Sequence, residues 1–137
     1  KQAEQYASLF PFPIYPMNYV SNEKELVDIY NAVDLYVTPS LQDNLPNTIV
    51  EAMACGIPCV GFNVGGIPQM IDHLHNGYVA EYQSAKDLAN GIRWTLTEGE
   101  YDNLSEEACR KALSSYSESI ISMRYIDIYN KITGSHA

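Results

Sequence analysis

The chain has 137 residues, of which 46% are hydrophobic and 18% charged, the composition of one ordinary globular domain. Eight Lys and Arg residues against 17 Asp and Glu residues give a net charge of −9, which argues against the basic surface that nucleic acid requires. No apolar run approaches the roughly 18 residues that span a bilayer. We therefore expect no nucleic-acid partner and no membrane-spanning segment.

The cysteines and histidines indicate no metal site. Three cysteines, an odd number without the spacing of a disulfide framework, predict free thiols and a cytoplasmic location. Cys55 and Cys59 are not followed by a second pair, so a zinc site is not expected. The two histidines of Asp72 to His75 have one residue between them and would point to opposite faces of an extended chain, so they are not expected to bind one metal. Because a turn at Asn76-Gly77 follows at once, this segment is interpreted as a surface turn.

The first part of the chain predicts a strand and a helix. Lys1 to Leu9 is typical of the polar end of a helix and indicates a piece of a longer protein. A short apolar strand is expected at Ile14 to Met17. Ser21 or Asn22 can cap the helix that follows, and Asn22 with Glu25 resembles a capping box. Apolar residues then recur at helical spacing as far as Val33.

Short strands and helices alternate along the rest of the chain. Buried strands are expected where β-prone runs end at turn residues, and helices where Pro or Ser precedes an apolar repeat. The expected elements are strands at Leu35 to Thr38, Pro58 to Phe62 and Tyr78 to Ala80, helices at Pro46 to Cys55, Ser84 to Thr97, Leu104 to Tyr116 and Glu118 to Ile132, and a helical turn at Gln69 to Ile71. This alternation predicts an α/β fold, a three-layer Rossmann-like sandwich with a mostly parallel sheet. His136 lies in a tail that we expect to be disordered.

Two loops should meet where ligands bind in such sheets, beyond the carboxyl ends of the strands. The first, Thr38 to Pro46, leads into a helix N-terminus that favours an anion. The second, Phe62 to Pro68, is rich in glycine, so its backbone can approach a ligand closely. The alternative is that Gly65-Gly66 only turns the chain and that Asn44 only caps the helix.

Two carboxylates flank the start of the helix after the first loop. Asp43 and Glu51 are eight residues apart, which is roughly 12 Å along a helix, so they cannot share a proton. They can face one small molecule if Asp43 lies in the loop and Glu51 in the helix. A buried Glu51 needs partners, either structural hydrogen bonds or the hydroxyls of a ligand.

The ordered motifs resemble those of a known family. The sequence Asp-Asn-Leu-Pro-Asn-Thr-Ile-Val-Glu-Ala-Met-Ala-Cys-Gly-Ile-Pro, residues 43–58, is similar to the donor-site signature of the glycogen-synthase-like GT-B glycosyltransferases, glycosyltransferase family four. That signature has two acidic residues separated by seven others, followed by Ala-Met-Ala, a small residue, Gly and Pro. Further similarities occur in the same order at Tyr19-Val20-Ser21, Ala32 to Leu35, Pro39-Ser40, Gly65 to Pro68 and Asn76 to Tyr78. The resemblance spans about Ile14 to Ala80.

The resemblance implies a role for each matching residue. Asp43 would contact hydroxyls of the transferred sugar, although the family more often has the longer Glu there. Glu51 would accept hydrogen bonds from the ribose, and backbone around Val20 would lie against the base. Backbone from Asn44 to Asn47 would face the sugar and diphosphate, with a hydroxyl from Thr48. The implied donor-binding residues are Val20, Asp43, Asn44, Leu45, Pro46, Asn47, Thr48 and Glu51; which residues are catalytic is left open, with Asp43 a candidate for positioning the sugar.

The resemblance also implies a domain organisation and an activity. Residues 1–137 would be part of a C-terminal nucleotide-sugar-binding domain, with the donor-site core at about 14–80 and C-terminal helices at 84–132. The enzyme would transfer a hexose from a nucleotide diphosphate sugar to a saccharide or lipid-linked acceptor, with retention and without a metal or other cofactor. A preceding N-terminal domain would bind the acceptor, and the enzyme could associate peripherally with the inner face of the membrane.

One departure from the family limits what this chain alone should do. The family usually supplies an Arg and a Lys to the diphosphate from Gly-Arg and Lys-Gly segments, and neither segment occurs in this sequence. We therefore expect the chain alone to bind nucleotides weakly and to be inactive. The alternative is a non-catalytic nucleotide or sugar-phosphate binding module. A pure interaction domain would leave Asp43 and Glu51 as accidental surface charges.

Overall fold

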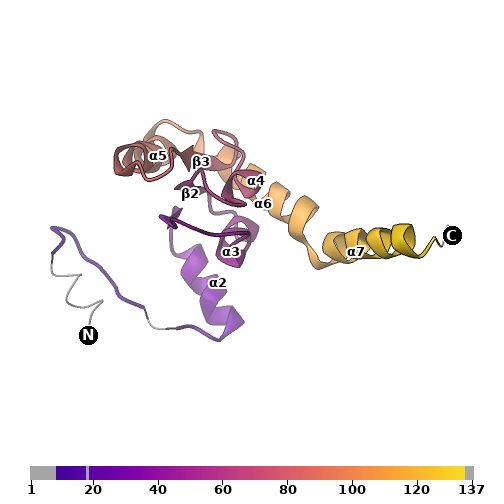
Figure 1. The fold of residues 1–137 in the computed structure, drawn as a ribbon. Helices are drawn as coiled ribbons and strands as arrows, with labels where there is room; N and C mark the ends of the chain where they lie inside the picture. The colour runs from indigo at the N-terminus through magenta and orange to yellow at the C-terminus, as the bar shows by residue number, and fades with distance from the viewer. Residues whose placement is uncertain (1–8, 18, 135–137) are drawn as a thin grey trace.

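The computed structural model describes residues 9–17 and 19–134 (Figure 1). The helix end predicted for Lys1 to Leu9 lies outside these residues except for Leu9, and the tail with His136 lies outside them as well. The elements are α2 (Glu23–Asn31), β1 (Tyr36–Thr38), α3 (Asn47–Ala54), β2 (Cys59–Phe62), α4 (Ile67–Met70), β3 (Gly77–Ala80), α5 (Ala85–Thr97), α6 (Tyr101–Tyr116) and α7 (Glu118–Thr133).

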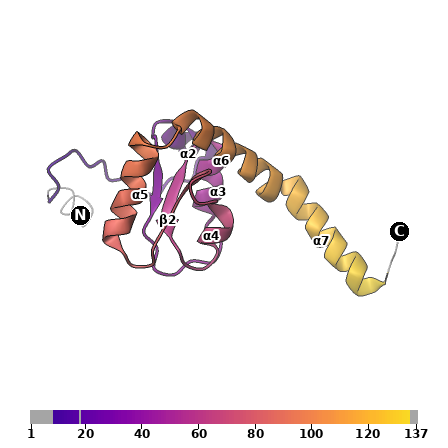
Figure 2. The ribbon, with the colours of Figure 1, turned by 90° about the horizontal axis from the view of Figure 1, so that it is seen from above.

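The described strands form one parallel sheet in the order β1-β2-β3. Central strand β2 is buried at all four positions, as expected for a parallel sheet covered on both faces. Figure 2 shows α5 on one side of the sheet and α3 with α4 on the other. The predicted α/β fold with a parallel sheet in three layers is therefore confirmed. Most predicted boundaries lie within two residues of the structure, and α6 begins three residues earlier than expected, at Tyr101.

The strand predicted at Ile14 to Met17 is wrong. Within the described residues this segment pairs with no strand, and Tyr15 is 84% exposed. An apolar run becomes a strand only where a sheet edge accepts its backbone hydrogen bonds, and that depends on the rest of the fold rather than on the run itself. The cap predicted for the next helix is confirmed, because the Asn22 side chain accepts hydrogen bonds from the amides of Lys24 and Glu25 at 2.9 and 3.4 Å.

The core lies between α3, the sheet and α6. Ile49, Ala52 and Met53 on α3 are fully buried, and they belong to one apolar cluster with Ala108 and Ala112 of α6. Burying these side chains removes apolar surface from water and fixes α3 against the sheet. The helix whose N-terminus faces the candidate loops is therefore a rigid part of the domain.

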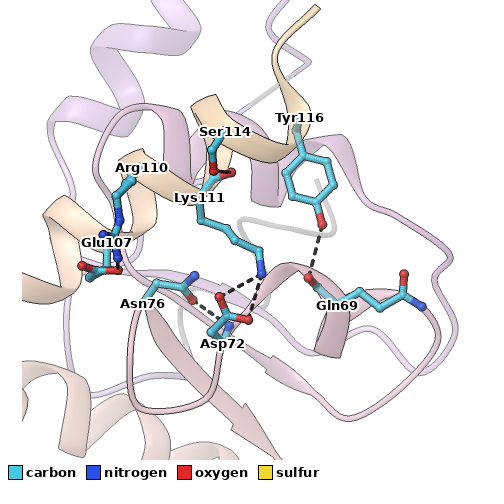
Figure 3. Close-up of polar contacts among 8 residues, drawn as sticks. All are labelled: Gln69, Asp72, Asn76, Glu107, Arg110, Lys111, Ser114 and Tyr116. Atoms are coloured by element: carbon cyan, nitrogen blue, oxygen red, sulfur yellow. Dashed lines mark hydrogen bonds and ion pairs between the residues drawn. The ribbon is translucent and has the colours of Figure 1, made fainter. Parts of the chain in front are cut away.

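Polar contacts join α6 to α4 and to the segment that follows it (Figure 3). The Nζ of Lys111 lies 2.8 Å from both carboxylate oxygens of Asp72, and the Tyr116 hydroxyl donates to the carbonyl of Gln69 at 3.3 Å. The Nδ1 of His73 accepts from the amide of Val79 at 3.1 Å. Asp72 and His73 thus have structural partners in an exposed segment, which agrees with the surface-turn interpretation.

The last helix, α7, projects from the body of the domain (Figures 1 and 2). None of its residues is buried, and its neighbour in the fold is α6. Met123, Tyr125 and Tyr129 are between 53% and 61% exposed, so much of the apolar surface of α7 is open. Among the described helices, none has the length and apolar character that a bilayer crossing requires.

Candidate functional site

The two candidate loops pack directly on each other at the carboxyl ends of β1 and β2. Gly65 has φ +55°, and a Cβ on it would lie 1.6 Å from the carbonyl oxygen of Asp43. A Cβ on Gly66 would lie 1.8 Å from the carbonyl oxygen of Asn44. The glycines are therefore required for contact between the two loops, which is more than a simple turn. The Tyr82 hydroxyl also holds the first loop, donating to the carbonyl of Leu41 at 3.1 Å.

Helix α3 begins immediately after the first loop with an open N-terminus. Its N-cap is Pro46, whose carbonyl accepts from the Ile49 amide at 3.1 Å, and among the described residues no side chain caps the helix. The alternative that Asn44 serves as the cap is therefore wrong. The first-turn amides of Asn47 and Thr48 have no carbonyl partner within the helix, and the first turn carries no acidic residue. The helix end is thus suited to an anionic group.

Most candidate residues around this helix end are accessible. Asp43 and Pro46 are half-buried, and Asn44, Leu45, Asn47 and Thr48 are exposed. Val20 is half-buried, two residues before the Asn22 cap of α2. The loops and α3 therefore bring the predicted residues 43–48 together on one surface.

Glu51 lies on α3 and is half-buried beside α2. Its Oε2 accepts a hydrogen bond of 3.1 Å from the hydroxyl of Tyr30, which is 6% exposed. Burial, followed by the hydrogen bond and the charge of Glu51, raises the pKa of Tyr30, so the phenol remains a donor at ordinary pH. A cavity of about 270 Å³ between α2 and α3 is lined by Leu26, Tyr30 and Glu51, among others.

Two tyrosines in the site were not predicted as functional residues. Tyr30 approaches the Thr48 carbonyl at 3.4 Å as well as Glu51, and the Tyr36 hydroxyl donates to Oγ1 of Thr48 at 2.8 Å. Their rings meet edge to face, with centroids 6.1 Å apart. Both lie in apolar stretches of the sequence, where a tyrosine is normally read as a core residue. Their hydroxyls instead join α2 and β1 to the first turns of α3.

A second cavity adjoins the first toward the C-terminal end of α3, and the two share Val27, Ala54 and Cys55 in their linings. It measures about 850 Å³ and is lined by Asn31, Cys55 and Cys109, among others, from α2, the end of α3 and α6. None of the predicted donor-binding residues lines it. The three cysteines are free, as the sequence predicts.

Comparison with known proteins identifies the family. The sequence model of the family described as glycosyl transferases group 1 matches residues 17–112, which include both candidate loops, α3 and the core strands. The chain belongs to this family. The predicted resemblance to a GT-B glycosyltransferase is thereby confirmed, and the segment that carries it, residues 43–58, lies within the matched part.

Two relatives of this group 1 chain are bacterial enzymes. Over 117 residues it is 30% identical to the N,N'-diacetylbacillosaminyl-diphospho-undecaprenol alpha-1,3-N-acetylgalactosaminyltransferase of Campylobacter jejuni. The aligned segment covers 85% of this chain and 31% of the relative. Over 112 residues it is 29% identical to the N-acetyl-alpha-D-glucosaminyl L-malate synthase of Bacillus anthracis, covering 81% of this chain and 29% of the relative. The chain thus spans less than a third of each relative's length.

Solved structures show the same fold. The sucrose-phosphate synthase of Thermosynechococcus elongatus superposes with a TM-score of 0.72 at 24% identity, covering 82% of this chain and 29% of that one. Anabaena Alr3699/HepE, solved in complex with UDP-glucose, has a TM-score of 0.70 at 23% identity, covering 78% and 30%. The described residues thus share the fold of less than a third of each of those two chains.

Proposed function

We propose that this chain is the nucleotide-sugar donor-binding part of a glycosyltransferase. The enzyme transfers a hexose from a nucleotide diphosphate sugar to a saccharide or lipid-linked acceptor, with retention. The observation that carries the proposal is the open N-terminus of α3 between Asp43 and Glu51, at the carboxyl ends of parallel strands. The UDP-glucose complex of HepE and the diphospho-undecaprenol in the name of the C. jejuni relative support these substrate classes.

Each part of the site has one proposed task. The amides of Asn47 and Thr48, with the loop backbone from Asn44, bind the diphosphate and the part of the sugar that adjoins it. The carboxylate of Asp43 accepts hydrogen bonds from sugar hydroxyls, and that of Glu51 accepts them from the ribose. Backbone around Val20 lies against the base.

Catalysis rests on positioning and on electrostatic stabilisation of the leaving diphosphate. Negative charge grows on the diphosphate as its bond to the sugar breaks, and the amides at the start of α3 stabilise that charge. No metal or other cofactor is part of the proposal. The N-terminal domain of a GT-B enzyme would supply the acceptor site, and a lipid-linked acceptor would bring the enzyme to the cytoplasmic face of the membrane.

The two carboxylates should affect different kinetic constants in the full protein that carries this chain. Ribose contacts are the same before and during transfer, so Glu51→Gln should raise the donor KM about tenfold or more, taking a charged hydrogen bond as about 1.5–3 kcal/mol. Asp43 holds the group whose charge and geometry change, so Asp43→Asn should lower kcat more than it raises KM. Steady-state kinetics with varied donor, and inhibition by free nucleotide, measure both effects.

The control is Glu98→Gln, since Glu98 is exposed at the C-terminal end of α5 and should leave both constants unchanged. If Glu51→Gln left nucleotide inhibition unchanged, Glu51 would be a structural carboxylate and not a ribose ligand. Nucleotide binding without transfer from any nucleotide sugar would instead favour the non-catalytic binding module.

A further inference from the structure

Tyr30 and Glu51 form a part-buried polar contact beside the proposed donor site. The Tyr30 hydroxyl lies 3.1 Å from Oε2 of Glu51 and 3.4 Å from the carbonyl oxygen of Thr48. The Tyr30 ring is 6% exposed and belongs to the apolar core cluster. A ring packed in this way cannot swing aside, so the position of its hydroxyl is fixed by the contact of α2 with α3.

This contact leaves Glu51 able to bind a ligand. The hydrogen bond uses Oε2, while Oε1 and the further lone pair of Oε2 remain acceptors. The cavity of about 270 Å³ between α2 and α3 borders the same side chain, which is half-buried rather than enclosed. Burial and the neighbouring carboxylate raise the pKa of Tyr30, so the phenol stays protonated and donates a hydrogen bond to Glu51.

We propose that Tyr30 is a positioning residue for ribose recognition, holding one oxygen of Glu51 so that the carboxylate is aimed at the ribose hydroxyls. The inference rests on the proposed function, because it takes Glu51 as the ribose ligand. A free Glu side chain samples several rotamers, and fixing it before the ligand arrives reduces the entropy lost on binding. Tyr30 itself touches no substrate in this account.

The test compares ribonucleotides with deoxyribonucleotides in the full protein that carries this chain. UDP, ADP and GDP are titrated by calorimetry, and the tightest binder is then compared with its 2′-deoxy and 3′-deoxy analogues. The wild type should prefer the ribonucleotide by about tenfold, the worth of one hydrogen bond to a charged group. Tyr30→Phe should reduce this preference about threefold or more by weakening ribonucleotide binding, with little change for the deoxy analogue that lacks the contacted hydroxyl.

Tyr78→Phe is the matched control. The Tyr78 hydroxyl also donates to a carboxylate, that of Asp87 at 3.0 Å, but on the α5 side of the sheet. This variant should keep the full ribose preference. In a Glu51→Gln background, Tyr30→Phe should have no further effect on the preference, because the two residues act as one unit.

A second variant guards against loss of folding. Replacing Tyr30 with 4-aminophenylalanine keeps the ring and an N–H donor, so the ribose preference should be retained. The inference is overturned if Tyr30→Phe lowers all affinities equally or not at all, or if the aminophenylalanine variant loses the preference. A wild type that binds nucleotides without preferring ribose would overturn the ribose role of Glu51 and this inference with it. A wild type that binds no nucleoside diphosphate would contradict the proposed function itself.

Discussion

Cys59 shows how burial determines the chemistry of a single side chain in this domain. It lies in β2 with no exposed surface, and burial raises its pKa above the ordinary value of 9.0. Above pH 9 the thiol of the unfolded chain therefore loses its proton while the folded thiol keeps it. The unfolded state then binds fewer protons, so the free energy of unfolding falls as the pH rises.

This linkage predicts an alkaline loss of stability to which Cys59 contributes a measurable share. Urea unfolding between pH 8 and pH 10.5 should show the free energy of unfolding decreasing above pH 9, with about 1.4 kcal/mol per pH unit from Cys59. Cys59→Ala should remove this contribution, although it also lowers stability at every pH by leaving a small cavity. Val60→Ala, at the next buried position of β2, also leaves a small cavity but removes no titratable group, so it should keep the slope. Equal slopes in the two variants would show that Cys59 does not contribute.

Residue roles were predictable from the sequence only where a motif carries them. The spacing of Asp43 and Glu51 and the resemblance around it pointed to the helix start that the structure places beside the sheet. Tyr30 could not be predicted, because it lies 21 residues before Glu51 and meets it only through the packing of α2 on α3. Asn44 was open to interpretation as a cap, yet the chain enters α3 through Pro46 without a side-chain cap.

At the scale of elements, the central feature is the contact between the loops after β1 and β2. Strands and helices were predictable because their apolar periodicity and turn residues are local. The loop contact was not, because the same glycines suit a turn, a ligand or a close backbone approach. The failed strand at Ile14 to Met17 has a similar cause, since strand pairing is decided by distant residues.

Substitution of Gly65 should show what the loop contact is worth. Gly65 and Gly56 both have a left-handed backbone, at φ +55° and +75°, but the nearest atom to a Cβ on Gly56 is Oγ of the Ser105 side chain, at 2.9 Å. Gly65→Ala and Gly56→Ala therefore share the backbone strain, and only the first collides with backbone, at the carbonyl of Asp43. The free energy of unfolding should fall further in Gly65→Ala, by about 1–3 kcal/mol. Equal losses in urea unfolding would show that the loops are not held together as described.

For the whole molecule, the unequal burial of the last two helices predicts where the cooperative unit ends. Leu104, Ala108 and Ala112 of α6 are buried in the core, whereas α7 contributes no buried residue. Deleting residues 118–137 should change the free energy of unfolding by less than about 1 kcal/mol, since little apolar surface is lost. Deleting residues 101–137 should prevent folding. A large loss from the shorter deletion would mean that α7 packs on the domain.

We propose that a nucleotide diphosphate sugar binds at the start of α3. Hydrogen–deuterium exchange of the full protein, followed by mass spectrometry with and without a saturating nucleoside diphosphate, tests it most directly. We expect slower exchange in peptides that cover residues 43–51, because the open amides of Asn47 and Thr48 become hydrogen-bonded to phosphate. Unchanged exchange in these peptides, with protection instead at the cavity lined by Asn31, Cys55 and Cys109, would contradict it.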